Sequence, residues 1–177
     1  MNYKKENINM KLNLASNPQI DSIVDGIGLR TVIWFQGCRH NCYNCHNPQT
    51  HHFNKVIEWE IDDIVQFYVN QKLQDGITLS GGDCFFQPEG LLILLQKLKQ
   101  YNINIWCYTG FTYEYLLQNY KQYLYYIDIL VDGKYIHKLR DLSLYFRGSS
   151  NQRIIDIQQS LQQDKIILLK IPGENNE

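Results

Sequence analysis

Three of the chain's five cysteines lie within eight residues, in the stretch QGCRHNCYNCHNP from Gln36 to Pro48. Their spacing is Cys38-x3-Cys42-x2-Cys45. Cysteine thiolates bind zinc and iron–sulfur clusters, and they also attach haem. The spacing therefore predicts a metal or cofactor site, and the number of ligands that the loop provides decides which kind.

Four interpretations of these cysteines are open. Three unrelated core thiols would need an apolar segment, whereas this one carries charged and amide side chains. The C-x-x-C-H pattern at 42–46 matches covalent haem attachment, which requires export and leaves Cys38 without a role. A 4Fe-4S cluster held by three thiolates would leave one iron open to a small molecule. A structural zinc site would add one histidine from the set His40, His46, His51 and His52.

Composition indicates one soluble globular domain, residues 1–177, with 44% hydrophobic residues, 20% charged residues and a formal net charge of -1. Charges nearly cancel and no long basic run occurs, so we expect no nucleic-acid partner. No apolar stretch has the length of a signal peptide or a membrane span, so we expect a cytoplasmic protein without a membrane partner. In that reducing compartment, an odd number of clustered cysteines favours metal binding over disulfides.

Strands and helices alternate along the chain. This alternation predicts an α/β fold, in which a parallel sheet is covered by helices. The length allows five or six βα units rather than the eight of a full barrel. We expect an open partial (β/α)6-type barrel, with a doubly wound sheet as the alternative. The predicted strands are 31–35, 77–80, 103–108 and 127–131, with weaker signals at 153–157 and 166–171, and the predicted helices are 60–73, 88–100 and 112–124.

A glycine-rich loop, Gly81-Gly82-Asp83, follows the second predicted core strand, and the cysteine loop follows the first. In either architecture, ligands bind at the carboxyl ends of the strands, so we expect these loops to lie side by side. Glycine allows a ligand to approach the backbone closely, and Asp83 adds negative charge. A simple glycine turn at the end of a strand is the alternative.

Six segments carry a resemblance to a known family. They occur in order from Ser22 to Asp156: SIVDGIGLRTVIWFQGC, CHNPQT, ITLSGGDCFFQP, IWCYTGFTYEYL, IDILVDGKYI and LRDLSLYFRGSSNQRIID. Together with the C-x3-C-x2-C spacing, they resemble the radical S-adenosylmethionine (radical-SAM) enzymes that activate anaerobic ribonucleoside-triphosphate reductase. The cysteine motif alone indicates the superfamily, and the last segment points to the activases.

The resemblance implies two cofactors, one 4Fe-4S cluster and S-adenosylmethionine. Cys38, Cys42 and Cys45 would hold the cluster, and the amino and carboxylate groups of S-adenosylmethionine would bind its open iron. One electron would cleave a C–S bond, and the resulting 5'-deoxyadenosyl radical would take a hydrogen atom from a glycine of the reductase, leaving a glycyl radical. No catalytic residue beyond the cluster and S-adenosylmethionine is expected, because cofactors supply the difficult step.

The resemblance also implies which residues bind S-adenosylmethionine. One group would contact the amino group of its methionine part, and the other would hold adenine, mainly through the backbone. The first group is Gly81, Gly82 and Asp83, and the second is Asn44, Cys45 and His46.

Other cysteines and histidines have weaker assignments. Cys84 stands where relatives often have proline, and we expect an incidental thiol, with a fourth cluster ligand as the alternative. Cys107 lies in an apolar strand and is expected in the core. His40, His51 and His52 are expected to be solvated loop residues.

Partners follow from the same resemblance: the large subunit of the anaerobic reductase, and a low-potential electron donor such as flavodoxin. A chain that spends nearly all its residues on the core leaves the site uncovered, which favours a protein substrate. Arg30, Arg147 and Arg153 would bind a carboxylate or the partner, and for Arg30 and Arg153, which lie beside strands, structural ion pairs are the alternative. Two alternatives are a radical-SAM enzyme for a pyruvate formate-lyase type enzyme or a small heterocycle, and a non-catalytic iron–sulfur or zinc module.

Overall fold

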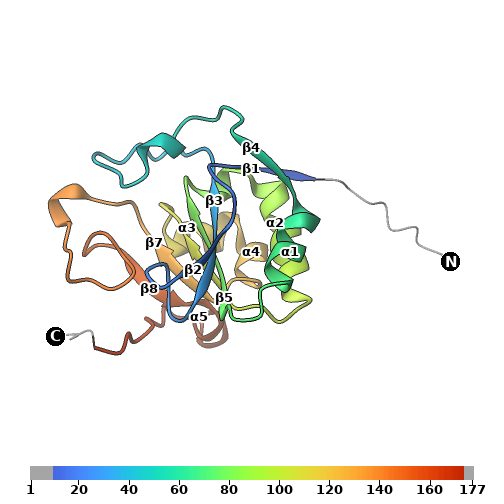
Figure 1. Cartoon of the computed structure of the whole chain (residues 1–177). Coiled ribbons are helices and arrows are strands. Elements are labelled where there is room, and N and C mark those ends of the chain that lie inside the picture. Colours follow the sequence, from blue (N-terminus) through green and yellow to red (C-terminus); the bar gives the residue numbers. More distant parts are fainter. Residues whose placement is uncertain (1–9, 174–177) are drawn as a thin grey trace.

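Four parallel strands form the centre of one sheet, as the alternation of strands and helices predicts (Figure 1). A computed structural model describes residues 10–173 of the chain. The parallel strands lie side by side in chain order: β3 (Arg30–Phe35), β5 (Gly76–Gly81), β6 (Ile105–Tyr108) and β7 (Ile129–Asp132). Their carboxyl ends therefore meet at one edge of the sheet, where the functional loops begin.

Antiparallel strands flank this centre and complete a sheet of eight strands with the order β4-β1-β3-β5-β6-β7-β8, in which β2 also pairs with β3. The described residues thus hold four parallel strands, fewer than the five or six βα units expected. A parallel strand needs a crossover connection, and the chain between β7 and β8 contains no α-helix, so β8 returns antiparallel. The flanking strands are β1 (Lys11–Leu14), β2 (Gln19–Ser22), β4 (Ile57–Glu60) and β8 (Arg153–Asp156).

Five α-helices occur among the described residues, and Figure 1 shows α1 and α2 side by side against the sheet. The predicted helix at 112–124 begins as expected, since the Thr112 hydroxyl accepts a hydrogen bond from the Tyr115 amide. It is broken at Tyr120, whose φ is -136°. The helices are α1 (Ile61–Val69), α2 (Pro88–Lys99), α3 (Tyr113–Asn119), α4 (Lys121–Leu124) and α5 (Ile157–Gln163).

Alternate residues of the central strands face opposite sides of the sheet, since side chains alternate along a strand. Ile105 and Cys107 of β6 belong to the main core beneath the helices. Trp106 belongs to a second apolar cluster on the other face, and Tyr108 packs against it. That second face carries a cavity of about 700 Å³. None of the helices within residues 10–173 has the length and apolar character needed to cross a membrane.

Candidate functional site

The three clustered cysteines lie in an irregular loop that follows β3. Asn41 and Asn44 have φ angles of 50° and 52°, in the left-handed region that asparagine tolerates better than most residues. Each of these residues directly precedes a cysteine, so the chain turns just before Cys42 and again before Cys45. All three thiols, including that of Cys38, are free and half-buried.

Burial changes the acidity of these thiols. It raises the pKa of the Cys38 thiol to about 11. It also raises the pKa of the Cys42 thiol, to which the neighbouring Cys45 adds a smaller contribution. Metal ligands must be deprotonated, so binding of iron or zinc here would release protons from these thiols.

The cysteine loop offers three thiolate donors to a bound metal or cluster. Across residues 10–173, no three side chains of His, Cys, Asp or Glu converge closely enough to hold one metal ion. Structural zinc needs four donors around one ion, whereas each thiolate of a 4Fe-4S site binds a different iron. Cluster ligands therefore stand farther apart, and a hollow of about 420 Å³ borders Cys42 and Cys45.

The glycine-rich loop lies beside the cysteine loop, which confirms that prediction. The Gly82 amide donates to the Phe35 carbonyl at 2.8 Å, and the Asp83 amide donates to the Gly37 carbonyl at 3.0 Å. A Cβ added at Gly82 would lie 2.5 Å from the Gly37 carbonyl oxygen. Only glycine allows the two loops to approach this closely.

The Asp83 carboxylate accepts hydrogen bonds from the loops that follow three adjacent strands. Its Oδ2 accepts from His40 Nε2 at 2.8 Å, from the Thr109 hydroxyl at 2.8 Å and from the Gly110 amide at 2.9 Å, while Oδ1 accepts from the Phe85 amide at 3.0 Å. Asp83 is only 1% exposed, and it does not line the cavity described below. Its side chain therefore organises the loops themselves.

The expectation that His40 is solvated is wrong. Its side chain is only 7% exposed. The ring lies edge-on to Phe111 at a centroid distance of 4.5 Å and packs against Phe86 at 5.3 Å. Sequence reasoning missed this residue because its burial comes from the loops after β5 and β6, which are distant in sequence.

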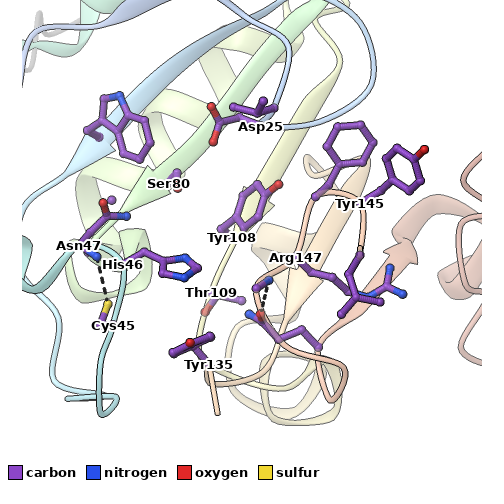
Figure 2. Close-up of a pocket in the computed structure, with 18 of the residues that line it drawn as sticks. Asp25, Cys45, His46, Asn47, Ser80, Tyr108, Thr109, Tyr135, Tyr145 and Arg147 are labelled. Atoms are coloured by element: carbon purple, nitrogen blue, oxygen red, sulfur yellow. Dashed lines mark hydrogen bonds between the residues drawn. The ribbon is translucent and has the colours of Figure 1, made fainter. Parts of the chain in front are cut away.

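A cavity of about 700 Å³ opens beside the cysteine loop (Figure 2). Cys45, His46, Gly81 and Gly82 line it, so the structure brings together four of the residues predicted to bind S-adenosylmethionine. Asn44 does not line the cavity, and its side-chain amide lies 3.3 Å from His137 Nε2. The cavity thus joins the cysteine loop to the glycine-rich loop.

One wall of the cavity is formed by the segment 133–152, in which sequence signals for strands and helices are weak. Tyr135, Arg147 and Gln152 from this segment line the cavity, as Figure 2 shows for Tyr135 and Arg147. The Tyr135 ring lies 4.9 Å from that of His46. No sequence pattern marks Tyr135 or Gln152 as a site residue, although their segment carries the most specific part of the resemblance.

Two further aromatic side chains that sequence analysis missed line the cavity, Trp34 from β3 and Tyr108 from β6. Burial raises the pKa of the Tyr108 hydroxyl far above its usual range, and the Asp25 carboxylate adds to this effect. Tyr108 therefore stays a neutral hydrogen-bonding group. Asp25 also lines the cavity and accepts a hydrogen bond from the Ser22 hydroxyl at 2.5 Å.

Two of the three arginines are structural. Arg30 is buried and donates to the Ile77 carbonyl at 2.5 Å and to Asn104 Oδ1 at 2.8 Å, and burial lowers its pKa to about 10. Arg153 donates to Asp132 and Glu114. Their side chains therefore hold strands and helices together rather than a ligand.

The Cys84 thiol lies in the core, with its Sγ 3.3 Å from Cys107 Sγ. Both residues are buried, and burial raises the pKa of the Cys84 thiol. The core position of Cys107 is confirmed. Cys84 is directed toward that core, as expected for an incidental thiol rather than a cluster ligand.

Known proteins resemble this chain over most of its length. Residues 24–155 match the family described as 4Fe-4S single cluster domain. The anaerobic ribonucleoside-triphosphate reductase-activating protein of Haemophilus influenzae is 34% identical over 142 residues, which span 75% of this chain and 90% of the relative. The protein of that name from Escherichia coli K12 is 35% identical over 142 residues, which span 73% of this chain and 90% of the relative. The protein of that name from Enterobacteria phage T4 is 30% identical over 137 residues, which span 74% of this chain and 86% of the relative.

Proposed function

Since the chain belongs to the family of anaerobic ribonucleoside-triphosphate reductase-activating proteins, we propose that it activates this reductase by radical-SAM chemistry. The observation that carries the proposal is the position of Cys45. This residue ends a loop of three half-buried thiols, and it also lines the cavity that Gly81 and Gly82 border. A cluster in the loop would therefore face a ligand in the cavity.

Cys38, Cys42 and Cys45 hold one 4Fe-4S cluster in this proposal, and the fourth iron is left for S-adenosylmethionine. When bound, these cofactors supply reductive cleavage of the C–S bond and hydrogen abstraction from a glycine of the reductase large subunit. The chain's own side chains bind, orient and shield the reactants.

S-adenosylmethionine occupies the large cavity in this proposal. Gly81 and Gly82 line this cavity, and their backbone groups would bind the amino group, since neither residue has a Cβ to keep a ligand away. The Asp83 carboxylate already accepts four protein hydrogen bonds, so this residue contributes through its position in the loop. His46 and the adjacent Tyr135 ring line the cavity and would contact adenine.

The same proposal interprets the fold as an open partial (β/α)6-type barrel formed by a single domain. The parallel order of β3, β5, β6 and β7 supports it, as does the position of the cluster loop after the first of these strands. A barrel left open on one side admits a loop of the large subunit to the cavity. A flavodoxin-like protein would deliver the electron.

The decisive experiment uses the full chain, reconstituted anaerobically with iron and sulfide and then reduced. With S-adenosylmethionine alone, we expect release of methionine and 5'-deoxyadenosine. With the reductase large subunit added, we expect a glycyl doublet in the electron paramagnetic resonance (EPR) spectrum. Cys38→Ala, Cys42→Ala and Cys45→Ala should each abolish both signals, and Cys84→Ala is the matched control that should retain them.

Three outcomes would contradict the proposal in different ways. Cleavage by a zinc-loaded, iron-free preparation would exclude cluster chemistry. Cleavage without a glycyl doublet would indicate a different substrate, such as a pyruvate formate-lyase type enzyme or a small heterocycle. Loss of cleavage in Cys84→Ala would show that the three-cysteine ligand set is wrong.

A further inference from the structure

We propose that His40 is a positioning residue. Its hydrogen bond to Asp83 holds the cysteine loop (the cluster loop of the proposed function) in place beside the glycine-rich loop that lines the cavity. This inference rests on the proposed function, because it concerns the same loop. His40 lies two residues after Cys38 and two residues before Cys42. The backbone of His40 therefore belongs to the short segment that carries both predicted ligands.

Asp83 is the point at which three loops meet. His40 reaches it from the loop after β3, while Thr109 and Gly110 reach it from the loop after β6. Asp83 itself belongs to the loop after β5, whose Gly82 lines the cavity. One carboxylate thus ties the cluster loop to the two loops that border the predicted S-adenosylmethionine site.

The surroundings of His40 favour one orientation of its ring. Phe111 and Phe86 pack against the ring. A Cβ added at Gly110 would lie 2.4 Å from His40 Cδ2, so the loop after β6 approaches the ring as closely as glycine allows. An ionised carboxylate only accepts hydrogen bonds, which places the shared hydrogen on Nε2.

Burial makes this hydrogen bond costly to lose. Asp83 is almost fully shielded from water, and a hydrogen bond to a charged group is stronger than one between neutral groups. Other contacts hold the far end of the cluster loop, where His46 meets Tyr135. Between Cys38 and Cys42, the hydrogen bond of His40 connects the loop to Asp83.

Two pairs of variants test the inference in the full, cluster-loaded chain. His40→Phe keeps a ring against Phe111 but has no donor. His40→Gln replaces the ring but places an amide donor at about the reach of Nε2, whereas the amide of His40→Asn falls one bond short. His52→Phe is the matched control, because His52 is an exposed histidine of the same loop.

The readouts are the rate of iron loss to a chelator and the EPR spectrum of the reduced cluster with and without S-adenosylmethionine. Mutation of a residue that orients metal ligands typically lowers metal affinity by about 10–100-fold. We therefore expect about tenfold faster iron loss in His40→Phe and His40→Asn. The change that S-adenosylmethionine causes in the spectrum should be weakened in both variants. His40→Gln and His52→Phe should behave as wild type.

Equal behaviour of His40→Phe and wild type in both readouts would overturn the inference. If circular dichroism shows that His40→Phe does not fold, the comparison of His40→Gln with His40→Asn decides, and equal values for these two would also overturn it. The proposed function fails separately, and before any variant is compared, if the wild-type chain assembles no four-iron cluster.

Discussion

The buried carboxylate of Asp83 accepts four hydrogen bonds. The substitution Asp83→Asn tests how much these hydrogen bonds contribute to the free energy of unfolding. The amide of asparagine replaces one acceptor oxygen with a donor, which would then face another donor. An unsatisfied buried group costs about 1–3 kcal/mol, so we expect the free energy of unfolding to fall by about 2 kcal/mol. Urea denaturation of the metal-free chain measures this change.

Glu89→Gln is the control for this prediction, because it makes a comparable change at an exposed side chain on α2. Exposed substitutions of this kind usually change stability by less than about 0.5 kcal/mol. A loss in Asp83→Asn no larger than in Glu89→Gln would show that the four hydrogen bonds contribute little.

Residue spacing predicts some of the site but not all of it. Cys38, Cys42 and Cys45 were recognisable because three thiols in a polar loop have few uses, and Gly82 because it follows a strand. Nothing local marks His40 as buried, since its partners Asp83 and Phe111 come from other loops. The role of a side chain that contacts several loops can be recognised only from the three-dimensional arrangement of the strands that carry those loops.

At the scale of elements, Arg153 links β8 to β7 and α3. Its guanidinium donates to Asp132 at 3.0 Å and to both carboxylate oxygens of Glu114 at 3.0 and 2.9 Å. These hydrogen bonds lower the pKa of Glu114 from 4.5 to about 2. The folded pKa lies below the unfolded one, so the stabilisation is present above about pH 4.5 and is lost as pH falls toward 2.

Glu114→Gln should therefore be less stable than wild type at pH 7, with a difference that narrows between pH 4.5 and 2. Because the Glu114 side chain is 58% exposed, solvent screening limits the effect to about 1 kcal/mol or less. Thermal denaturation of the metal-free chains across this pH range measures it. Added salt should shrink the difference at pH 7, and a difference independent of pH would contradict the ion-pair explanation.

Elements with strong periodic patterns were predicted well, including β3, β5, α1 and α2. The short strands β1 and β4 were missed because each has only four residues, in which polar and apolar side chains are mixed. The predicted strand at 166–171 is reduced to one isolated bridge, between Leu168 and Ile155. Pairing with distant strands, which no local pattern encodes, decides such cases.

For the whole molecule, three of the exposed apolar side chains line the cavity. Ile23, Val24 and Tyr145 line it and are exposed, and Leu142, from the same segment as Tyr145, is 82% exposed. In the proposed function, the reductase large subunit covers this rim. Leu142→Glu should then lower the yield of glycyl radical about tenfold, because a charge would be buried at the interface.

Cleavage of S-adenosylmethionine without the large subunit should stay unchanged in Leu142→Glu, since this residue does not line the cavity. Leu73→Glu is the matched control, because Leu73 is 78% exposed and lies outside the cavity-lining set. Quantitative EPR and product chromatography separate the two activities. An equal radical yield in both variants would place the large subunit elsewhere.

Two side-chain hydrogen bonds join the ends of the segment 133–152. The Asn151 side-chain amide donates to the Lys134 carbonyl at 2.8 Å, and the Gln152 side-chain amide donates to the Gly133 carbonyl at 3.1 Å. β7 and β8 are therefore joined regardless of what lies between these residues. Lengthening a loop whose ends are already held costs little entropy. A change in the length of this segment between Tyr135 and Asn151 would therefore leave the pairing of β7 with β8 in place.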